Sequence, residues 1–171
     1  MSDIEYFPLV TELGEVIGKV TRQECHSGSF LLHPVVHLHV FNSAGELYLQ
    51  KRAMNKDIQP GKWDTSVGGH VDYGEEVTHA LKREVGEELG IIAFEPIFIM
   101  RYKFVSHQEA ELVHSHYCIY DGEITPDPKE ISEGRFWKIA DIEANLVQNL
   151  FTPNFEQEFL KIIGNLKSLW A

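Results

Sequence analysis

The sequence predicts an α+β fold in which a mixed β-sheet is covered by α-helices. Strand-like apolar runs lie both before and after a segment of helical periodicity at residues 75–89. A second segment, from Pro153 onward, also repeats its apolar residues at the spacing of a helix. Strands on both sides of one central helix, followed by a helical tail, favour one sheet with helices packed against it.

Turn signals separate the expected strands. Apolar stretches on either side of residues 12–15 predict a short N-terminal hairpin. Residues 35–41 and 47–50 flank a turn-rich segment and predict a second hairpin. Two further strands are expected after the central helix, at 97–105 and 111–120.

Both predicted helices carry boundary signals. Gly90 follows the central helix and is expected to be its C-cap. Thr152 and Pro153 are expected to be the N-cap and the first residue of the helical tail. The tail then carries an apolar face made of Phe155, Phe159, Ile162, Ile163, Leu166 and Leu169.

The length of 171 residues is typical of one domain with one hydrophobic core. We therefore expect a single domain over residues 1–171, with the N-terminal hairpin as an extension of about 30 residues. With 43% hydrophobic and 24% charged residues, the composition is that of an ordinary globular protein rather than of a disordered one.

The composition also excludes several classes of partner. The net charge of −11, without a basic stripe, argues against nucleic acid. No apolar run approaches the roughly 18–20 residues of a membrane helix, so no membrane contact is expected. The acidic N-terminus does not resemble an export signal, and Cys25 and Cys118 do not suggest a disulfide framework. A cytoplasmic location is therefore expected.

The central helix places three carboxylates at the border of an apolar stripe formed by Val77, Leu81, Val85 and Leu89. Glu84, Glu87 and Glu88 fall within a sector of about 100° that overlaps the edge of this stripe. Clustered carboxylates at an apolar border are costly, because desolvation and mutual repulsion both oppose their ionisation. A divalent cation removes this cost, and Mg²⁺ prefers oxygen ligands. The alternative is a solvated helix face with ion pairs such as Arg83–Glu87.

The residues around this helix complete a recognisable pattern. Gly69 is followed after five residues by Glu75, and after seven more by the run Arg83-Glu-Val-Gly-Glu-Glu-Leu-Gly-Ile91. This pattern resembles the Nudix box at every defined position. The resemblance implies the Nudix fold, a mixed β-sheet sandwiched between α-helices.

The same resemblance implies a cofactor and a set of roles. Glu84, Glu87 and Glu88 would bind Mg²⁺ or Mn²⁺, and together with Arg83 they form the expected catalytic set. Glu75 would hold Arg83 in a salt bridge that ties the preceding loop to the helix. The substrate would be a small molecule that contains a diphosphate linkage.

Ligands of this kind explain why the expected reaction is hydrolysis. A diphosphate resists attack by water because its oxygens are negative and its leaving group is charged. Mg²⁺ bridges such oxygens, lowers the pKa of a bound water and stabilises the leaving phosphate. A nearby carboxylate can act as general base. The base is open among the three box glutamates and two loop glutamates, Glu130 and Glu133.

Further motifs lie outside the box. They are Arg22-Gln-Glu-Cys-His26, His33, Gln50-Lys-Arg-Ala53, Lys56, Pro60-Gly-Lys-Trp63 and Ser66-Val-Gly-Gly-His70. Together they resemble type I isopentenyl-diphosphate isomerase, a Nudix-fold enzyme that acts on a diphosphate ester. The resemblance implies that Arg22, Arg52 and Lys56 contact the substrate diphosphate; the alternative is ordinary surface charge.

Departures from the isomerase pattern bear on the reaction. Gly68 stands where the isomerase has its catalytic cysteine, and His116 is matched to its catalytic glutamate. Isomerisation needs an acid and a base across the double bond, and both are missing in this match. The expected function is therefore hydrolysis, with isomerisation and a non-catalytic ligand sensor as the alternatives.

The isomerase pattern also contains a second metal site, made of three histidines and two glutamates. The histidines match His26, His33 and His70, and the glutamates are matched to His114 and His116. Imidazoles in place of carboxylates would shift the preference toward a transition metal such as Zn²⁺ or Ni²⁺. The alternative is a set of isolated histidines that bond to backbone or water, a class to which His37 and His39 are assigned.

The sequence leaves two features open. The Nudix box concerns only the shared phosphate portion, so the group attached to the diphosphate is open between a nucleoside derivative and an isoprenoid-like chain. The oligomeric state is equally open, and a homodimer is considered alongside a monomer.

Overall fold

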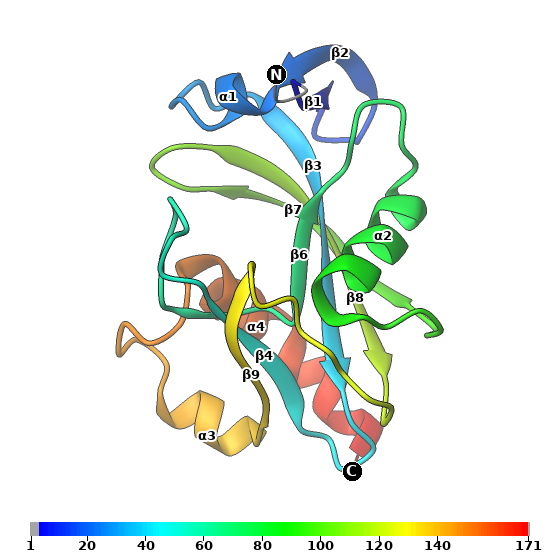
Figure 1. Cartoon of the computed structure of the whole chain (residues 1–171), viewed down its shortest axis with the longest axis vertical. Coiled ribbons are helices and arrows are strands. Elements are labelled where there is room, and N and C mark those ends of the chain that lie inside the picture. The colour runs from blue at the N-terminus through cyan, green and yellow to red at the C-terminus, as the bar shows by residue number, and fades with distance from the viewer. Residues whose placement is uncertain (1–3, 171) are drawn as a thin grey trace.

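The computed structural model describes residues 4–170 and shows a mixed β-sheet with helices on both of its faces, which confirms the predicted fold class (Figure 1). Within those residues the main sheet has seven strands in the order β5-β4-β3-β8-β7, with β6 paired to β3 and β9 to β4. The strands are β1 (Tyr6–Val10), β2 (Val16–Thr21), β3 (Leu32–Phe41), β4 (Leu47–Arg52), β5 (Trp63–Asp64), β6 (Val67–His70), β7 (Ile97–Val105), β8 (Ala110–Ile119) and β9 (Ile131–Trp137). The helices are α1 (Arg22–Cys25), α2 (Val77–Leu89), α3 (Ile139–Ala144), α4 (Pro153–Leu166) and the 3₁₀ turn η1 (Lys167–Trp170).

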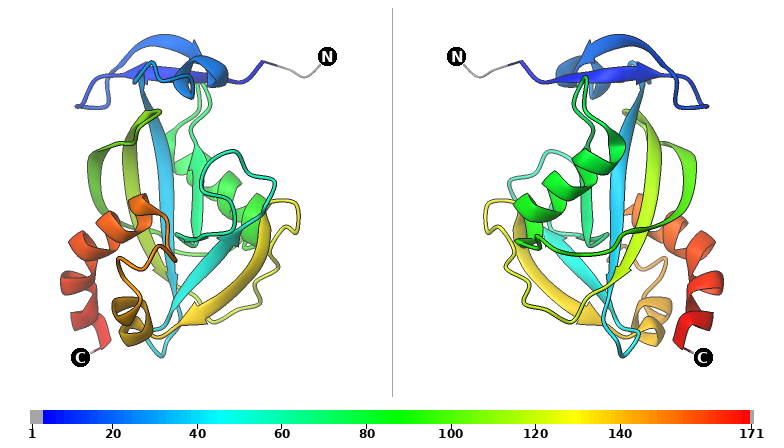
Figure 2. Two further views of the ribbon diagram at one scale, coloured as in Figure 1. Left: turned by 90° about the vertical axis from the view of Figure 1, so that its left-hand side faces the viewer. Right: turned by 90° about the vertical axis from the view of Figure 1, so that its right-hand side faces the viewer.

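The long strand β3 is the centre of the sheet, and its two faces contact different helices. β6 pairs with β3 antiparallel and β8 pairs with it parallel, on opposite edges. Side chains alternate between the faces of a strand. Val36 and Leu38 pack against α2 in an apolar cluster, whereas His37 and His39 reach Glu158 of α4. Figure 2 shows α2 and α4 on opposite sides of β3.

The sheet splits beside β3, and the split makes room for a site. β3 pairs with β4 only at Phe41 and Leu47, and β4 then pairs with β5 and β9. Farther along β3, the strand β6 takes the neighbouring position. The two branches diverge, and side chains from both line a pocket between them.

The central helix α2 ends at the predicted residue but begins two residues later than expected. Gly90 adopts a left-handed φ of 67°, and its N–H donates to the carbonyl of Gly86. Glycine takes this conformation without the steric cost that a side chain would bring. At the other end, Glu75 N–H donates to the carbonyl of Asp72, so a turn occupies the first expected residues of the helix.

The C-terminal helix α4 has the predicted cap. The Thr152 hydroxyl accepts the N–H of Phe155 at 3.2 Å, and Pro153 is the first helical residue. Phe155 and Phe159 are fully buried in a cluster with β4 and β9, so apolar packing fixes the helix on the sheet.

Several short elements are not visible in the periodicity. β5 and β6 span two and four residues, and β6 contains Gly68 and Gly69, which have low strand propensity. The helix α1 is a single turn closed by a capping box between Thr21 and Glu24. The N-terminal hairpin is confirmed as β1 and β2. In the described chain, no helix is both long and apolar enough to cross a membrane.

Candidate active site

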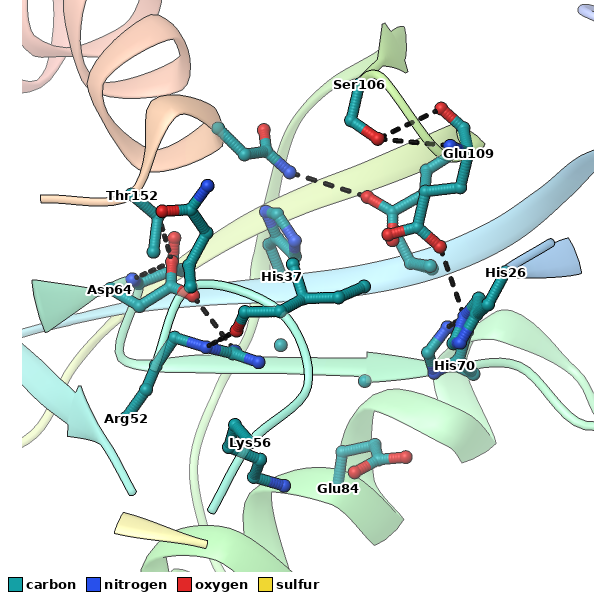
Figure 3. A pocket seen from close by; sticks show the side chains of 18 of the residues that line it. His26, His37, Arg52, Lys56, Asp64, His70, Glu84, Ser106, Glu109 and Thr152 are labelled. Carbon is teal, nitrogen blue, oxygen red and sulfur yellow. Dashed lines mark hydrogen bonds and ion pairs between the residues drawn. The ribbon is translucent and has the colours of Figure 1, made fainter. Parts of the chain in front are cut away.

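A pocket of about 1040 Å³ lies where β6 and β4 diverge (Figure 3). The glutamates of the box, two of the predicted histidines and the three predicted basic residues all line it. In Figure 3, His26, His70 and Glu109 lie together on one side of the pocket. Asp64 lies on the other side, and His37 lies between. The split of the sheet therefore brings together residues from α1, β3–β6, α2 and β8.

The three glutamates of the box reach this pocket from α2. Glu88 is 9% exposed and accepts a hydrogen bond from Gln50 Nε2 at 2.9 Å. Burial, followed by repulsion from Glu84, raises the pKa of Glu88 to about 8. Burial also raises the pKa of Glu84, although Arg83 opposes the shift. Two carboxylates whose ionisation is opposed by burial are a donor set that a divalent cation would stabilise, and the site therefore fits Mg²⁺.

Gly69 allows Glu84 to approach the strand. A Cβ placed on Gly69 would overlap the Glu84 side chain, so any other residue would force this carboxylate away from β6. This close packing gives a physical reason for the first glycine of the box. Glu87 differs from the other two, because its side chain is 61% exposed at the mouth of the pocket.

Arg83 connects the loop before α2 to the carboxylates. Its guanidinium donates to both oxygens of Glu75 at 2.9 Å, which confirms the predicted salt bridge. It also donates to the carbonyl of His70 at 3.0 Å and to Glu84 at 2.8 Å. A planar guanidinium with several fixed donors can hold such a network where a lysine could not. Arg83 therefore orients Glu84 and joins α2 to the end of β6.

A second group of donors lies beside the box glutamates, where β6 ends at His70. His26, His33, His70 and Glu109 each offer one ligand atom, and these atoms all lie within 4.8 Å of one another. The Nε2 atoms of His26 and His70 are 3.3 Å apart, and Glu109 Oε2 lies 3.1 Å from His26 Nε2. The structure thus brings together the three predicted histidines.

The protonation of this group suits a metal ion. His33 Nδ1 lies 2.9 Å from the carbonyl of Leu31, to which it donates, so the neutral ring presents a lone pair at Nε2. Burial lowers the pKa of all three histidines, that of His26 to about 4. Among the described residues, the buried His33 Nε2 has no hydrogen-bond partner. The buried Glu109 Oε2 makes no well-aligned hydrogen bond, although His26 Nε2 lies 3.1 Å away. Neutral imidazoles and an unsatisfied carboxylate oxygen are what a bound cation requires.

The structure corrects the assignment of His114 and His116. Across β3 and β8, His33 is paired with Glu111, whereas Val36 is paired with His114. Paired residues share a face of the sheet, so His114 and His116 lie on the face opposite His33. They are not part of the histidine cluster: His116 Nδ1 donates to the carbonyl of His114 at 3.1 Å.

Two other acidic residues lie on this side of the sheet: Glu109, which belongs to the cluster, and Glu111. Both line the pocket. Glu111 shares the face of His33 through their pairing, and Glu109, just before β8, places Oε2 4.0 Å from His33 Nε2. Glu111, and not His116, therefore lies on the face of His33 and in the pocket. The second site then combines imidazole with carboxylate, and the expected shift to a purely imidazole site is wrong. The signal in the sequence was the Glu-x-Glu alternation at the start of the strand.

The three predicted basic residues line the pocket, but each one already has an acidic partner. Arg22 lies 3.1 Å from Glu5 and Arg52 lies 3.3 Å from Asp64. Lys56 forms an ion pair with Glu130. Each positive charge in the pocket is therefore balanced by a neighbouring carboxylate. A substrate phosphate would compete with these carboxylates for the same cations.

The loop glutamates proposed as general bases differ in position. Glu130 lines the pocket beside Lys56, together with the box glutamates. Glu133 lies on β9, where its side chain is exposed, and it does not line the pocket. Glu130 therefore stays a candidate base, and the position of Glu133 removes it from the set.

A buried network that periodicity does not reveal lies next to the pocket. The carboxylate of Glu158, on α4, is fully buried and lies 2.6 Å from His37 Nδ1 and 2.9 Å from His39 Nε2. The Tyr102 hydroxyl donates to the same carboxylate at 2.9 Å. The assignment of His37 and His39 to isolated histidines is therefore wrong. Their i, i+2 spacing on one strand was the available signal, but the partner lies more than a hundred residues away.

Comparison with known proteins gives several matches. The sequence profile of the NUDIX domain matches residues 31–157. Isopentenyl-diphosphate Delta-isomerase 1 of Photorhabdus laumondii is 32% identical over 170 residues, which cover 95% of this chain and 97% of that protein. An uncharacterized Nudix hydrolase of Listeria monocytogenes is 32% identical over 168 residues, which cover 96% of each chain. The solved structure of DR0079 from Deinococcus radiodurans has a TM-score of 0.80 at 24% identity and covers 92% of this chain and 98% of its own.

Proposed function

The chain belongs to the NUDIX domain family, and from this premise we propose that it is a Mg²⁺-dependent hydrolase that cleaves a diphosphate linkage in a small metabolite. The observation that carries the proposal is the complete box. Glu84, Glu87 and Glu88 all reach one pocket, and burial opposes the ionisation of two of them. A non-catalytic ligand sensor would have no need for this full set of carboxylates.

Each box residue has a distinct task in the proposed reaction. When bound, Mg²⁺ supplies a water of lowered pKa and stabilises the leaving phosphate. The partly buried Glu84, the buried Glu88 and the exposed Glu87 would together hold this ion. Arg83 keeps Glu84 in position through its 2.8 Å hydrogen bond. Glu130 lines the same pocket and would serve as the general base.

A second metal ion is proposed at the histidine cluster. His26, His33 and His70 supply imidazole nitrogens, and Glu109 supplies a carboxylate oxygen. Three imidazoles with one carboxylate suit ions such as Zn²⁺ or Mn²⁺ better than Mg²⁺. When bound, this ion would supply a second positive charge next to the box, because Arg83 joins Glu84 to the carbonyl of His70.

An isomerase is the second candidate, because one relative with that name is 32% identical over almost the whole chain. Glu111 lines the pocket and would supply one of the two groups that isomerisation needs. The other group is missing, since Gly68 has no side chain at the position of the thiol. Incubation with isopentenyl diphosphate separates the candidates: a hydrolase releases phosphate or diphosphate, and an isomerase forms the rearranged allylic diphosphate.

We predict that Glu87→Gln and Glu88→Gln each lower diphosphate hydrolysis at least about a hundredfold while the protein stays folded. Glutamine keeps the volume of the side chain but removes the charge that binds Mg²⁺. Hydrolysis is measured as released phosphate from a panel of nucleoside and isoprenoid diphosphates at saturating Mg²⁺. Glu123→Gln, at an exposed glutamate outside the pocket, is the matched control. Near wild-type turnover of both box variants would show that the assigned site is wrong.

We predict that the protein purified without a histidine tag retains about one transition-metal ion per chain, and that His70→Ala loses it. His114→Ala is the matched control, because His114 is a half-buried histidine outside the cluster. Elemental analysis of the three proteins measures the content. Equal and negligible metal in the wild type and in His70→Ala would contradict the second site and leave the Mg²⁺ site untouched.

A further inference from the structure

The buried network around Glu158 leaves one nitrogen for the pocket. The Glu158 carboxylate accepts hydrogen bonds from His37, His39 and Tyr102. These three contacts all lie inside the protein. His37 contacts Glu158 through Nδ1, and within residues 4–170 its Nε2 has no acceptor. His37 is also the member of the histidine pair that lines the pocket, whereas His39 is fully buried and does not.

The absence of a side chain at Gly68 exposes that nitrogen. Gly68 is paired directly with His37 across β3 and β6. A Cβ on Gly68 would lie 3.4 Å from His37 Cδ2 and 3.6 Å from Nε2, so any side chain here would cover the ring. With glycine in place, the imidazole edge faces the pocket directly.

Glu158 keeps this imidazole charged. Burial alone would lower the pKa of His37, but the charge and hydrogen bond of Glu158 outweigh burial and raise the pKa to about 9. In turn, His37 and His39 hold the pKa of Glu158 well below its ordinary value despite its burial. At neutral pH, Nε2 therefore carries a proton and is a charge-assisted hydrogen-bond donor.

The surroundings of His37 in the pocket are polar. The pocket wall around His37 is mostly polar: Val35, Phe104 and Pro153 are apolar, whereas Asp64, Glu111, Thr152, Asn154 and Gln157 carry polar groups. A hydrocarbon chain bound here would remove water from these groups and from the Nε2 proton. It would offer no new hydrogen bonds in place of those to water. A group with its own oxygen or nitrogen atoms would satisfy them.

We propose that His37 Nε2 donates a hydrogen bond to an acceptor atom of the group that the substrate carries on its diphosphate, so that His37 selects a polar group over a hydrocarbon chain. This inference rests on the proposed diphosphate hydrolase. Each side of β6 would then bind one part of the substrate. The diphosphate lies on the side of Glu84, and the attached group lies on the side of His37.

The test is calorimetric binding of non-hydrolysable probes in the presence of Mg²⁺. The probes are methylenediphosphonate and its adenosyl, uridyl, glucosyl and isopentenyl esters. The wild type is expected to bind at least one polar ester more tightly than the isopentenyl ester. In His37→Gln, the affinity for that polar ester, relative to methylenediphosphonate, should fall at least about tenfold, as expected for the loss of a hydrogen bond to a charged group.

Two further variants separate a contact from a folding defect. His39→Gln removes the other histidine of Glu158 without touching the pocket, and it should leave the affinity ratio within about twofold. Gly68→Ala adds a methyl group at ordinary contact distance from His37, so it should fold normally and reproduce the selective loss. An unchanged ratio in Gly68→Ala and His37→Gln, an equal loss in His39→Gln, or a preference of the wild type for the isopentenyl ester would overturn the proposal. Selective binding without hydrolysis of any diphosphate would instead reject the hydrolase and leave the His37 contact standing.

Discussion

Gly68 and Gly69 are neighbours in β6 and serve opposite faces of that strand. Because Gly68 has no side chain, His37 is exposed to the pocket. Because Gly69 has none, Glu84 can pack against the strand. Because consecutive residues of a strand point to opposite sides, a single short strand separates the carboxylates of the box from the imidazole. Two glycines lower the stability of a strand. In β6 they allow His37 and Glu84 to approach the backbone closely, which larger residues would prevent.

We predict that Gly69→Ala lowers hydrolysis about a hundredfold with little change in melting temperature, because a misplacement of about 1 Å is enough to disrupt catalysis. The added Cβ would overlap the end of the Glu84 side chain, which is flexible enough to turn away and leave the fold intact. Turnover and thermal unfolding are measured on the same preparation. The matched control is Gly164→Ala in α4, where nothing lies within 4 Å of the added Cβ. Unchanged turnover in Gly69→Ala would mean that Glu84 is not held against β6.

The helices α2 and α4 could be predicted closely from the sequence, because their signals are local. Apolar residues repeat at the helical period over more than ten positions, and Thr152 and Gly90 mark the ends that the structure confirms. Glu84, Glu87 and Glu88 follow from the same helix, since residues of one helix keep their relative positions wherever the helix packs. The box half of the site was therefore accessible before any tertiary contact was known.

The strand β8 shows where prediction from the sequence ends. Its bounds were expected within one residue, but its register with β3 was not, and a strand changes face with every residue. Matching by spacing chose His114 and His116, whereas the pairing of His33 with Glu111 selects the opposite face. The partner of His37 is harder still, because Glu158 belongs to a helix that packs against β3 only in the tertiary structure.

Across the whole protein, several buried groups hold protons more tightly in the folded state than in the unfolded one. The pKa of Glu88 is raised to about 8 by burial, and that of Glu111 is raised to about 8 by burial and by the charge of Glu109. The pKa of His37 is raised to about 9 by Glu158, which outweighs burial. Stability falls with rising pH wherever the folded state binds more protons than the unfolded state. The stabilising effect of His37 is therefore complete below its unfolded pKa of about 6.5 and is lost as the pH rises through about 9.

We predict that the melting temperature of the metal-free protein falls as the pH is raised from about 6.5 to about 9. The buried histidines whose pKa is lowered make stability rise with pH, but only below their unfolded pKa of about 6.5. Between about 6.5 and 9, the change in melting temperature therefore reflects His37, Glu88 and Glu111. Mg²⁺ binds the ionised form of Glu88, so it should raise the melting temperature more at the alkaline end of the window than at the acidic end. Thermal unfolding in EDTA and in Mg²⁺ measures both effects, with His37→Gln expected to flatten the slope in EDTA. A melting temperature that rises across this window without metal would contradict the protonation states on which the pocket depends.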